Sequence, residues 1–144
     1  MTTAEPRPKA RRKADTLARL SAPVLDAWVA SADYLVPLTL AWHGERLLLA
    51  TGRGTPTVRN ITARGRARIA DGPTRDVIMI DAVLERTAET AEFGEVFAAQ
   101  NDWDPRTAGP DYVFLVLRPE RIQAWREENE LAGRLLMKEG RWLV

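Results

Sequence analysis

The sequence predicts a mainly β fold with short helices, most simply an antiparallel barrel of six or seven strands. Two observations favour this fold. Short apolar runs, rich in leucine, valine and isoleucine, are separated by turn segments such as Gly72-Pro73-Thr74-Arg75. The stretches between these runs contain only short helical patterns, whereas parallel strands need long crossover helices. A small antiparallel barrel therefore fits the chain better than a parallel sheet does.

The first predicted element is a helix over residues 14–32. Leu17, Leu20 and Trp28 belong to a series of apolar residues with spacings of three and four, which places them on one helix face. Pro23 lies within this range, and we expect it to divide the helix in two.

A second, shorter helix is expected to begin at Pro56. Thr55 suits the N-cap, because its hydroxyl can accept a free backbone N–H of the first turn. Proline costs little at the first helical position, where its missing N–H would have no partner, and Gly65 is a natural stop. The remaining predicted elements are a helix over 90–100, strands over 34–42, 46–51, 66–71, 76–85, 112–117 and 121–126, and a hairpin within 135–144.

The run from Val77 to Leu84 is apolar on nearly both faces. A strand buried on both sides needs a second apolar layer, such as a helix or another subunit outside the barrel. Asp81 interrupts the run, and a buried carboxylate at this place needs a partner. We therefore expect the protein to be a homodimer, with this strand near the contact.

Composition excludes several classes of function. The 144 residues are most simply one domain, and without cysteine the chain has no disulfide, thiol nucleophile or cysteine-ligated metal. Because His43 is the single histidine, we expect no metal site. No apolar run reaches the roughly 18 residues that span a membrane, and the charged start lacks the apolar core of a signal peptide. We therefore expect a cytoplasmic protein without membrane contact.

Charge is unevenly distributed along the chain. Residues 1–13 contain five basic residues and one acidic residue, a net charge of +4. Since the whole chain carries +1, residues 14–144 carry −3. A mildly acidic body argues against a nucleic-acid surface. We expect a basic, disordered tail over 1–13 and a single domain over 14–144.

The stretch TGRGTPTVRN, from Thr51 to Asn60, predicts a phosphate site. Gly52 and Gly54 let the backbone come close to a ligand, and the helix start after them presents free N–H groups and partial positive charge. Arg59 can add a bidentate contact. The stretch lacks the lysine of a Walker loop and is not followed by a βαβ unit. The alternative is an ordinary capped helix with solvated arginines.

Six short motifs follow one another along the chain: Pro37–Trp42 (PLTLAW), Leu48–Thr51 (LLAT), Thr55–Asn60 (TPTVRN), Gly72–Asp76 (GPTRD), Arg121–Trp125 (RIQAW) and Gly133–Met137 (GRLLM). Their order and spacing resemble the pyridoxamine 5′-phosphate oxidase-like superfamily of flavin-binding split β-barrels, which are usually homodimers. The resemblance covers about residues 25–144. It implies a split barrel with a flavin site that two subunits share.

The resemblance also implies which residues contact the cofactor. One subunit would supply a strand along the isoalloxazine ring and the phosphate turn, and the other subunit would complete the site. The implied contacts are Pro37, Leu38, Thr39 and Leu40 along the ring; Thr51, Thr55 and Thr57 at the phosphate, with Arg59 and Asn60 close by; and Trp125 and Arg134 from the partner chain.

Two departures separate this chain from the oxidase itself. Pro56-Thr57 stands where the oxidase has an Arg-Lys pair, and Arg134-Leu-Leu-Met lacks the oxidase's histidine. The resemblance therefore implies the general flavin and deazaflavin reductase branches, with FMN or the deazaflavin coenzyme F-420 transferring hydride to or from a small organic substrate. Such chemistry belongs mostly to the cofactor, so no catalytic acid or base is required. The alternative is a non-catalytic flavin or haem carrier.

Overall fold

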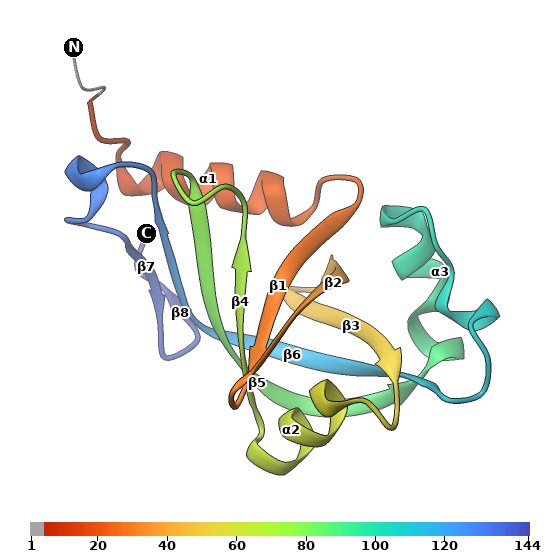
Figure 1. Ribbon diagram of the computed structural model, residues 1–144. Helices are drawn as coiled ribbons and strands as arrows, with labels where there is room; N and C mark the ends of the chain where they lie inside the picture. Colours follow the sequence, from red (N-terminus) through yellow and green to blue (C-terminus); the bar gives the residue numbers. More distant parts are fainter. Residues whose placement is uncertain (1–4) are drawn as a thin grey trace.

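One eight-stranded antiparallel sheet forms the body of the protein in the computed structural model, which describes residues 5–144 (Figure 1). The strand order is β3-β2-β1-β4-β5-β6-β7-β8, and β3 also pairs with β6, so six strands close into a barrel and β7 and β8 extend it. This confirms the predicted barrel. The strands are β1 (Leu25–Ser31), β2 (Tyr34–His43), β3 (Arg46–Gly52), β4 (Arg66–Asp71), β5 (Val77–Glu89), β6 (Tyr112–Trp125), β7 (Leu135–Lys138) and β8 (Arg141–Trp142).

The helices are α1 (Lys9–Leu20), α2 (Pro56–Arg64) and α3 (Thr90–Gln100), with 3-10 turns η1 (Pro105–Thr107) and η2 (Glu128–Glu130). The predicted start of α2 is confirmed. The Thr55 hydroxyl accepts the Val58 amide at 3.3 Å, and Gly65 ends the helix with a φ of 72°. Over the described part of the chain, no helix is both long and apolar enough to cross a membrane.

The predicted helix over 14–32 is wrong beyond Leu20. Residues Leu25–Ser31 form β1, because Leu25, Ala27 and Val29 alternate into the barrel interior and leave Trp28 outside. Val24, with a φ of 58°, lies between the helix and the strand. The spacing of the apolar residues in this segment satisfies a helix and a strand about equally well, and pairing with β2 and β4 decides between them.

Strands 112–117 and 121–126, predicted as two, are one continuous strand, β6. Pro119 does not turn the chain, because a bulge accommodates it. Asp81 pairs with Arg121 and Ala82 pairs with Pro119, so Glu120 is an extra residue in the ladder. The carbonyl of Glu120 accepts the amide of Gly140, at 2.9 Å, from the β7–β8 turn.

The disordered tail predicted over 1–13 is also at odds with the structure. Residues 1–4 lie outside the described part of the chain, but α1 begins at Lys9. Arg12 is only 3% exposed, because its guanidinium bonds to backbone carbonyls at the other end of the chain. Local composition predicts disorder here, since it carries no information about those distant partners.

Within the single chain, burial on both faces occurs at β3. For β5 the sequence predicts a helix or another subunit over the second face. Leu49 lies in the barrel interior, whereas Leu48 packs outside the barrel with Phe97 of α3. On β5, alternate residues such as Met79 and Asp81 remain half-buried. α3 thus forms an apolar layer over β3. The outer face of β5 stays uncovered in the single chain.

The end of α3 ties the first two strands together through side-chain amides. Asn101, 4% exposed, accepts the Leu25 amide and donates to the Leu40 carbonyl, both at 3.0 Å. Gln100 accepts the Trp42 amide at 2.8 Å. These bonds satisfy backbone groups of β1 and β2 that the sheet leaves unpaired.

We expect Asn101→Ala to lower the free energy of unfolding by about 2–4 kcal/mol, because it leaves two buried backbone groups without partners. Urea denaturation followed by circular dichroism measures this change. Asp102→Ala, at the exposed neighbouring position, is the matched control and should change stability by less than about 0.5 kcal/mol. Equal midpoints for the two variants would show that Asn101 does not anchor the strands.

Candidate functional site

The turn between β3 and α2 is the candidate phosphate site. The Thr55 hydroxyl donates to the Gly52 carbonyl at 2.9 Å and caps the helix, so it is already committed. Arg59 folds back and donates to the carbonyl of Gly54. Arg53 donates to both carboxylate oxygens of the exposed Glu89, each at 2.9 Å. The turn is therefore compact, with two guanidinium groups at its surface.

The threonines of this turn lie deeper than the resemblance implies. Thr51 and Thr57 are 8% and 2% exposed, so they shape the turn rather than present hydroxyls to solvent. Gly54 is exposed, and its amide makes no hydrogen bond to another described residue. A phosphate at this turn would meet the amide of Gly54 and the guanidinium groups of Arg53 and Arg59. This donor set suits a phosphate.

The two cofactor-binding segments that the resemblance implies flank the place where β2 and β3 separate, which we call the opening. It is a break in strand pairing rather than a cavity, since the buried Val58 and Ile61 of α2 belong to the barrel core. β2 pairs with β3 only as far as Leu40 and Leu49. Beyond that point β2 continues along β1, and β3 continues along β6 to Gly52. Residues 37–40 and 51–60 therefore lie on the two sides of the place where β2 and β3 separate.

Asn60 joins α2 to the end of β1 beside this opening. Its side-chain amide donates to the Ser31 carbonyl at 3.1 Å. The Ser31 hydroxyl is buried, and among the described side chains it is the one buried oxygen or nitrogen without a hydrogen-bond partner. Such groups are uncommon, so one hydrogen bond remains available at this end of β1.

Only alternate residues of the predicted ring-binding strand face outward. Leu40 is fully buried in the barrel core, and Leu38 packs against the same core. Pro37 is exposed and Thr39 is half-buried, with its hydroxyl donating to Asp26 at 2.5 Å. A ring lying on the outside of β2 would therefore touch Pro37 and Thr39, and Leu38 and Leu40 would support the strand from within.

Trp125 and Arg134 come together, but far from the phosphate turn of the same chain. The Arg134 guanidinium carbon lies 5.9 Å from the centre of the Trp125 ring. Tyr112 begins β6 opposite Gly52, and Trp125 ends the same strand. At about 3.3 Å per residue, this places roughly 40 Å of strand between them. One chain does not assemble all the predicted residues into one site.

The outward face of the sheet carries an apolar row that the sequence analysis missed. Trp28, predicted on a helix face, is 51% exposed on β1, and Leu35 is 61% exposed on β2. The alternation of apolar and polar residues over 25–31 is the signal that could have placed Trp28 on a strand surface. Consecutive cross-strand partners over β2, β1, β4, β5 and β6 are Pro37, Trp28, Ala70, Met79 and Gln123.

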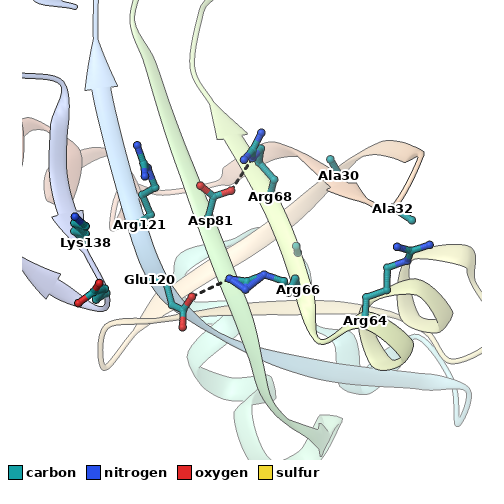
Figure 2. Close-up of a pocket in the computed structure, with 11 residues that line it drawn as sticks. Ala30, Ala32, Arg64, Arg66, Arg68, Asp81, Glu120, Arg121 and Lys138 are labelled. Atoms are coloured by element: carbon teal, nitrogen blue, oxygen red, sulfur yellow. Dashed lines mark hydrogen bonds and ion pairs between the residues drawn. The ribbon is translucent and has the colours of Figure 1, made fainter. Parts of the chain in front are cut away.

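A hollow of about 1050 Å³ opens on this same face, between α2 and the β7–β8 turn (Figure 2). Asp81 bonds to Arg68 at 2.6 Å, which supplies the partner that its position requires, and Arg66 bonds to Glu120 at 2.9 Å. The other cations of the hollow form no ion pair with a described residue. They are Arg64, Arg121 and Lys138. With five cations and three carboxylates in its lining, the hollow favours anions.

A buried carboxylate holds the segment before α1 against the chain after β6. Glu130, 2% exposed, accepts the side chain of Arg7 at 2.8 and 3.0 Å and the Arg126 amide at 2.9 Å. The Arg7 guanidinium lowers the pKa of Glu130 from its usual 4.5 to about 2, although burial acts in the opposite direction. The carboxylate in turn raises the pKa of Arg7. The charged composition of residues 126–130 would suit a solvated connection, but Glu130 is buried.

Metal-binding arrangements are absent from the described residues, since no three histidine, aspartate or glutamate side chains gather over residues 5–144. The cations at the opening are Arg53 and Arg59, and two carboxylates lie beside them: Glu89, which bonds Arg53, and Asp26, which bonds Thr39. The opening thus offers cation and backbone contacts to a ligand, together with the apolar outer surface of β2.

No protein-family model matches this sequence, and no curated protein sequence matches it. Solved structures do resemble the model. An F420 reductase superposes with a TM-score of 0.62 at 20% identity, over 73% of this chain and 93% of that one. A Listeria innocua protein assigned as a pyridoxamine 5′-phosphate oxidase gives 0.59 at 17% identity, over 81% and 98%. The chain has the split-barrel fold of the pyridoxamine 5′-phosphate oxidase-like proteins.

A third split barrel superposes over a larger part of this chain. The heme-binding protein from Mycobacterium smegmatis superposes with a TM-score of 0.61 at 23% identity, over 93% of this chain and 59% of that one. All these identities are low, so the likeness concerns the fold. It confirms the split barrel that the six motifs indicate.

We expect acid to remove the contribution of Glu130 to stability. Its pKa is lower in the folded protein than in the unfolded chain, so the ionised carboxylate stabilises the fold above about pH 4.5, and this contribution is lost as the pH falls towards 2. At pH 7, Glu130→Gln should cost roughly 1.5–3 kcal/mol. The difference from wild type should shrink steadily in urea denaturation at pH 7, 4 and 3.

Glu127→Gln is the control for this measurement. Glu127 is exposed and pairs with Arg75 at the surface, so its substitution should have a small effect at every pH. If the gap between Glu130→Gln and wild type is the same at pH 3 as at pH 7, the carboxylate is not held in its charged form by the fold.

Proposed function

We propose that the protein binds FMN or the deazaflavin coenzyme F-420 at the opening between β2 and β3, as an oxidoreductase that transfers hydride to or from a small organic substrate. One observation carries the proposal. The split barrel brings a surface turn with two arginines and a free glycine amide next to the outward residues of β2. The similarity in fold to an F420 reductase supports the same function.

The residues at the opening fit such a cofactor. Arg53, Arg59 and the Gly54 amide would hold its phosphate, and Pro37 and Thr39 would pack along its ring. When bound, the cofactor supplies the hydride chemistry. The chain supplies binding and orientation: the apolar outer surface of β2 excludes water from one face of the ring, and the guanidinium groups neutralise the phosphate.

The second candidate is a non-catalytic carrier of flavin or haem. The similarity in fold to the M. smegmatis heme-binding protein, which spans 93% of this chain, favours it. His43, the single histidine, is exposed in the β2–β3 turn, with its ring centre 6.3 Å from that of Phe93. It lies at the other end of β2 from the opening. A haem bound through this histidine would therefore occupy a different place from the flavin.

The uncovered outward face is the proposed contact of a homodimer. Exposed Trp28 and Leu35 form part of an apolar patch, and such patches on sheet faces mark interaction sites. In the sheet register, Leu35 lies at the β2 edge of this face and Trp125 at the diagonally opposite corner, on β6. A two-fold axis that lies in the contact plane near Ala70, perpendicular to this diagonal, brings each of the two corners over the other corner of the partner. The partner's Trp125 would then reach the opening beside β2.

The visible spectrum of the purified protein, reconstituted with each cofactor, tests the proposed function. FMN gives two bands, the deazaflavin a single blue-violet band and haem a Soret band. If the phosphate turn holds the cofactor, riboflavin should bind tens-fold or more weakly than FMN, because two charge-assisted contacts are worth about 1.5–3 kcal/mol each. Arg59→Ala should weaken FMN binding by roughly tenfold, measured by fluorescence titration at fixed salt.

Arg11→Ala is the matched control, because it removes the same charge from an exposed position on α1. Salt screens that distant charge over about 8–10 Å, so the FMN affinity should not change. Equal affinities for FMN and riboflavin, or equal effects of the two arginine variants, would place the phosphate elsewhere.

We expect the protein to be a dimer in light scattering at micromolar concentration, with a buried area on the order of 2,000 Å². Leu35→Glu puts a charge into the proposed contact and should shift the protein to monomers and reduce cofactor binding together. Leu143→Glu places the same charge at an exposed apolar residue outside this face, and should do neither. A dimeric Leu35→Glu variant that still binds cofactor would move the contact to another surface.

A further inference from the structure

We propose that Arg7, Arg12 and Glu130 form a clasp whose role is to position Trp125 and Arg134 for the cofactor site of the partner subunit. This inference rests on the proposed function. The clasp residues themselves are far from the phosphate turn of their own chain and are positioning residues, not residues that touch the cofactor.

Arg12 is the centre of the clasp. Its guanidinium donates to the carbonyls of Ala124 at 3.2 Å, Glu130 at 2.9 Å and Ala132 at 3.3 Å, and its Nε donates to the Arg7 carbonyl at 3.0 Å. Ala124 immediately precedes Trp125, and Ala132 lies two residues before Arg134. One rigid, planar group therefore fixes the chain shortly before each of the two site residues.

Glu130 holds the middle of the same segment. Its carboxylate accepts the backbone amide of Arg7 at 2.8 Å in addition to the Arg7 side chain and the Arg126 amide. The bond to the Arg126 amide ties Glu130 to the residue directly after Trp125, and the bonds to Arg7 tie it to the segment before α1. Arg7 is itself held by Asp15 of α1 at 3.0 Å, so the clasp is anchored to the first helix.

The orientation of Arg134 depends directly on this segment. Its guanidinium donates to the carbonyl of Leu131, the residue after Glu130, at 2.9 Å, and its Nε donates to Gln123 at 3.1 Å. The Ala124 amide donates to the Arg134 carbonyl at 2.9 Å. A shift of Glu130 would therefore move the Leu131 carbonyl and turn Arg134 away from the Trp125 ring.

Stability alone does not account for such a network. Replacing buried ion pairs with apolar residues of similar volume is often neutral or stabilising, so α1 could be held to β6 by apolar packing. Hydrogen bonds to named carbonyls, in contrast, fix direction as well as distance. The clasp thus supplies geometry to a surface segment that has only a short 3-10 turn, η2, of its own.

Arg12→Lys tests the clasp, because a single ammonium group keeps the charge but not the planar fork that spans three carbonyls. We expect a folded dimer by circular dichroism and light scattering whose affinity for FMN, or for F-420 if that is the cofactor, falls about tenfold. Glu130→Gln, which keeps the shape of the side chain, should act in the same direction. Arg11→Lys, one residue away on the exposed side of α1, should bind like wild type.

A mixed dimer separates positioning in the partner from damage within one chain. One protomer carries Arg12→Lys, the other carries Arg59→Glu in the phosphate turn, and two affinity tags isolate the pair. If the clasp serves the partner, one of the two sites combines an intact turn with an intact clasp. Half of the sites should then bind with wild-type affinity, although each variant alone as a homodimer binds weakly.

The binding measurements distinguish the clasp from the proposed function. A mixed dimer without any wild-type site, or an Arg12→Lys homodimer that binds like wild type, overturns the clasp and leaves the proposed function standing. A wild-type protein that binds neither FMN nor F-420 overturns both. Wild-type affinity in half of the mixed-dimer sites, with weak binding in both homodimers, supports both.

Discussion

The pairing of β5 with β6 is the constraint on which the rest of the structure depends. These two strands run through the whole sheet, so β4 pairs along β5 while β3 and β7 pair along opposite ends of β6. The bulge at Glu120 keeps the ladder continuous past Pro119. A continuous ladder of this length places the turn after Gly52 and Trp125 at opposite ends of β6. A second subunit is therefore the simplest way to complete a site that uses both.

Sequence signals within an element or next to it predicted the elements whose ends depend on neighbouring residues. The cap at Thr55 and the stop at Gly65 both lie within α2 or next to it, and α3 and β4 have the predicted bounds. Where partners far along the chain decide, prediction failed. Trp28 has a spacing that suits a helix, but β2 and β4 pair with its segment. Pro119 predicts a turn, but β5 accepts it through a bulge.

The candidate site likewise has one part that local sequence predicts and another part that it does not. The capped turn before α2 was predictable because glycines, a cap and arginines stand within ten residues of one another, and its use as a phosphate site stays a prediction. The identity of its exposed donors was not, since burial of Thr51 and Thr57 depends on how β3 and α2 pack. Arg12 and Glu130 gave no local signal, because a hydrogen bond between positions 118 residues apart leaves no periodicity in either segment.

This separation in sequence bears on the order of events during synthesis. The carbonyls that Arg12 binds belong to residues near the end of the chain, so α1 cannot dock while the ribosome is still producing β6 and the segment after it. Contacts of such long range form late and slow folding. α1 is thus made before the strands but settles after them, and until it does the strands at this end of the sheet lack their cover. A nascent chain would spend that interval exposed to chaperones and to misassembly with its neighbours.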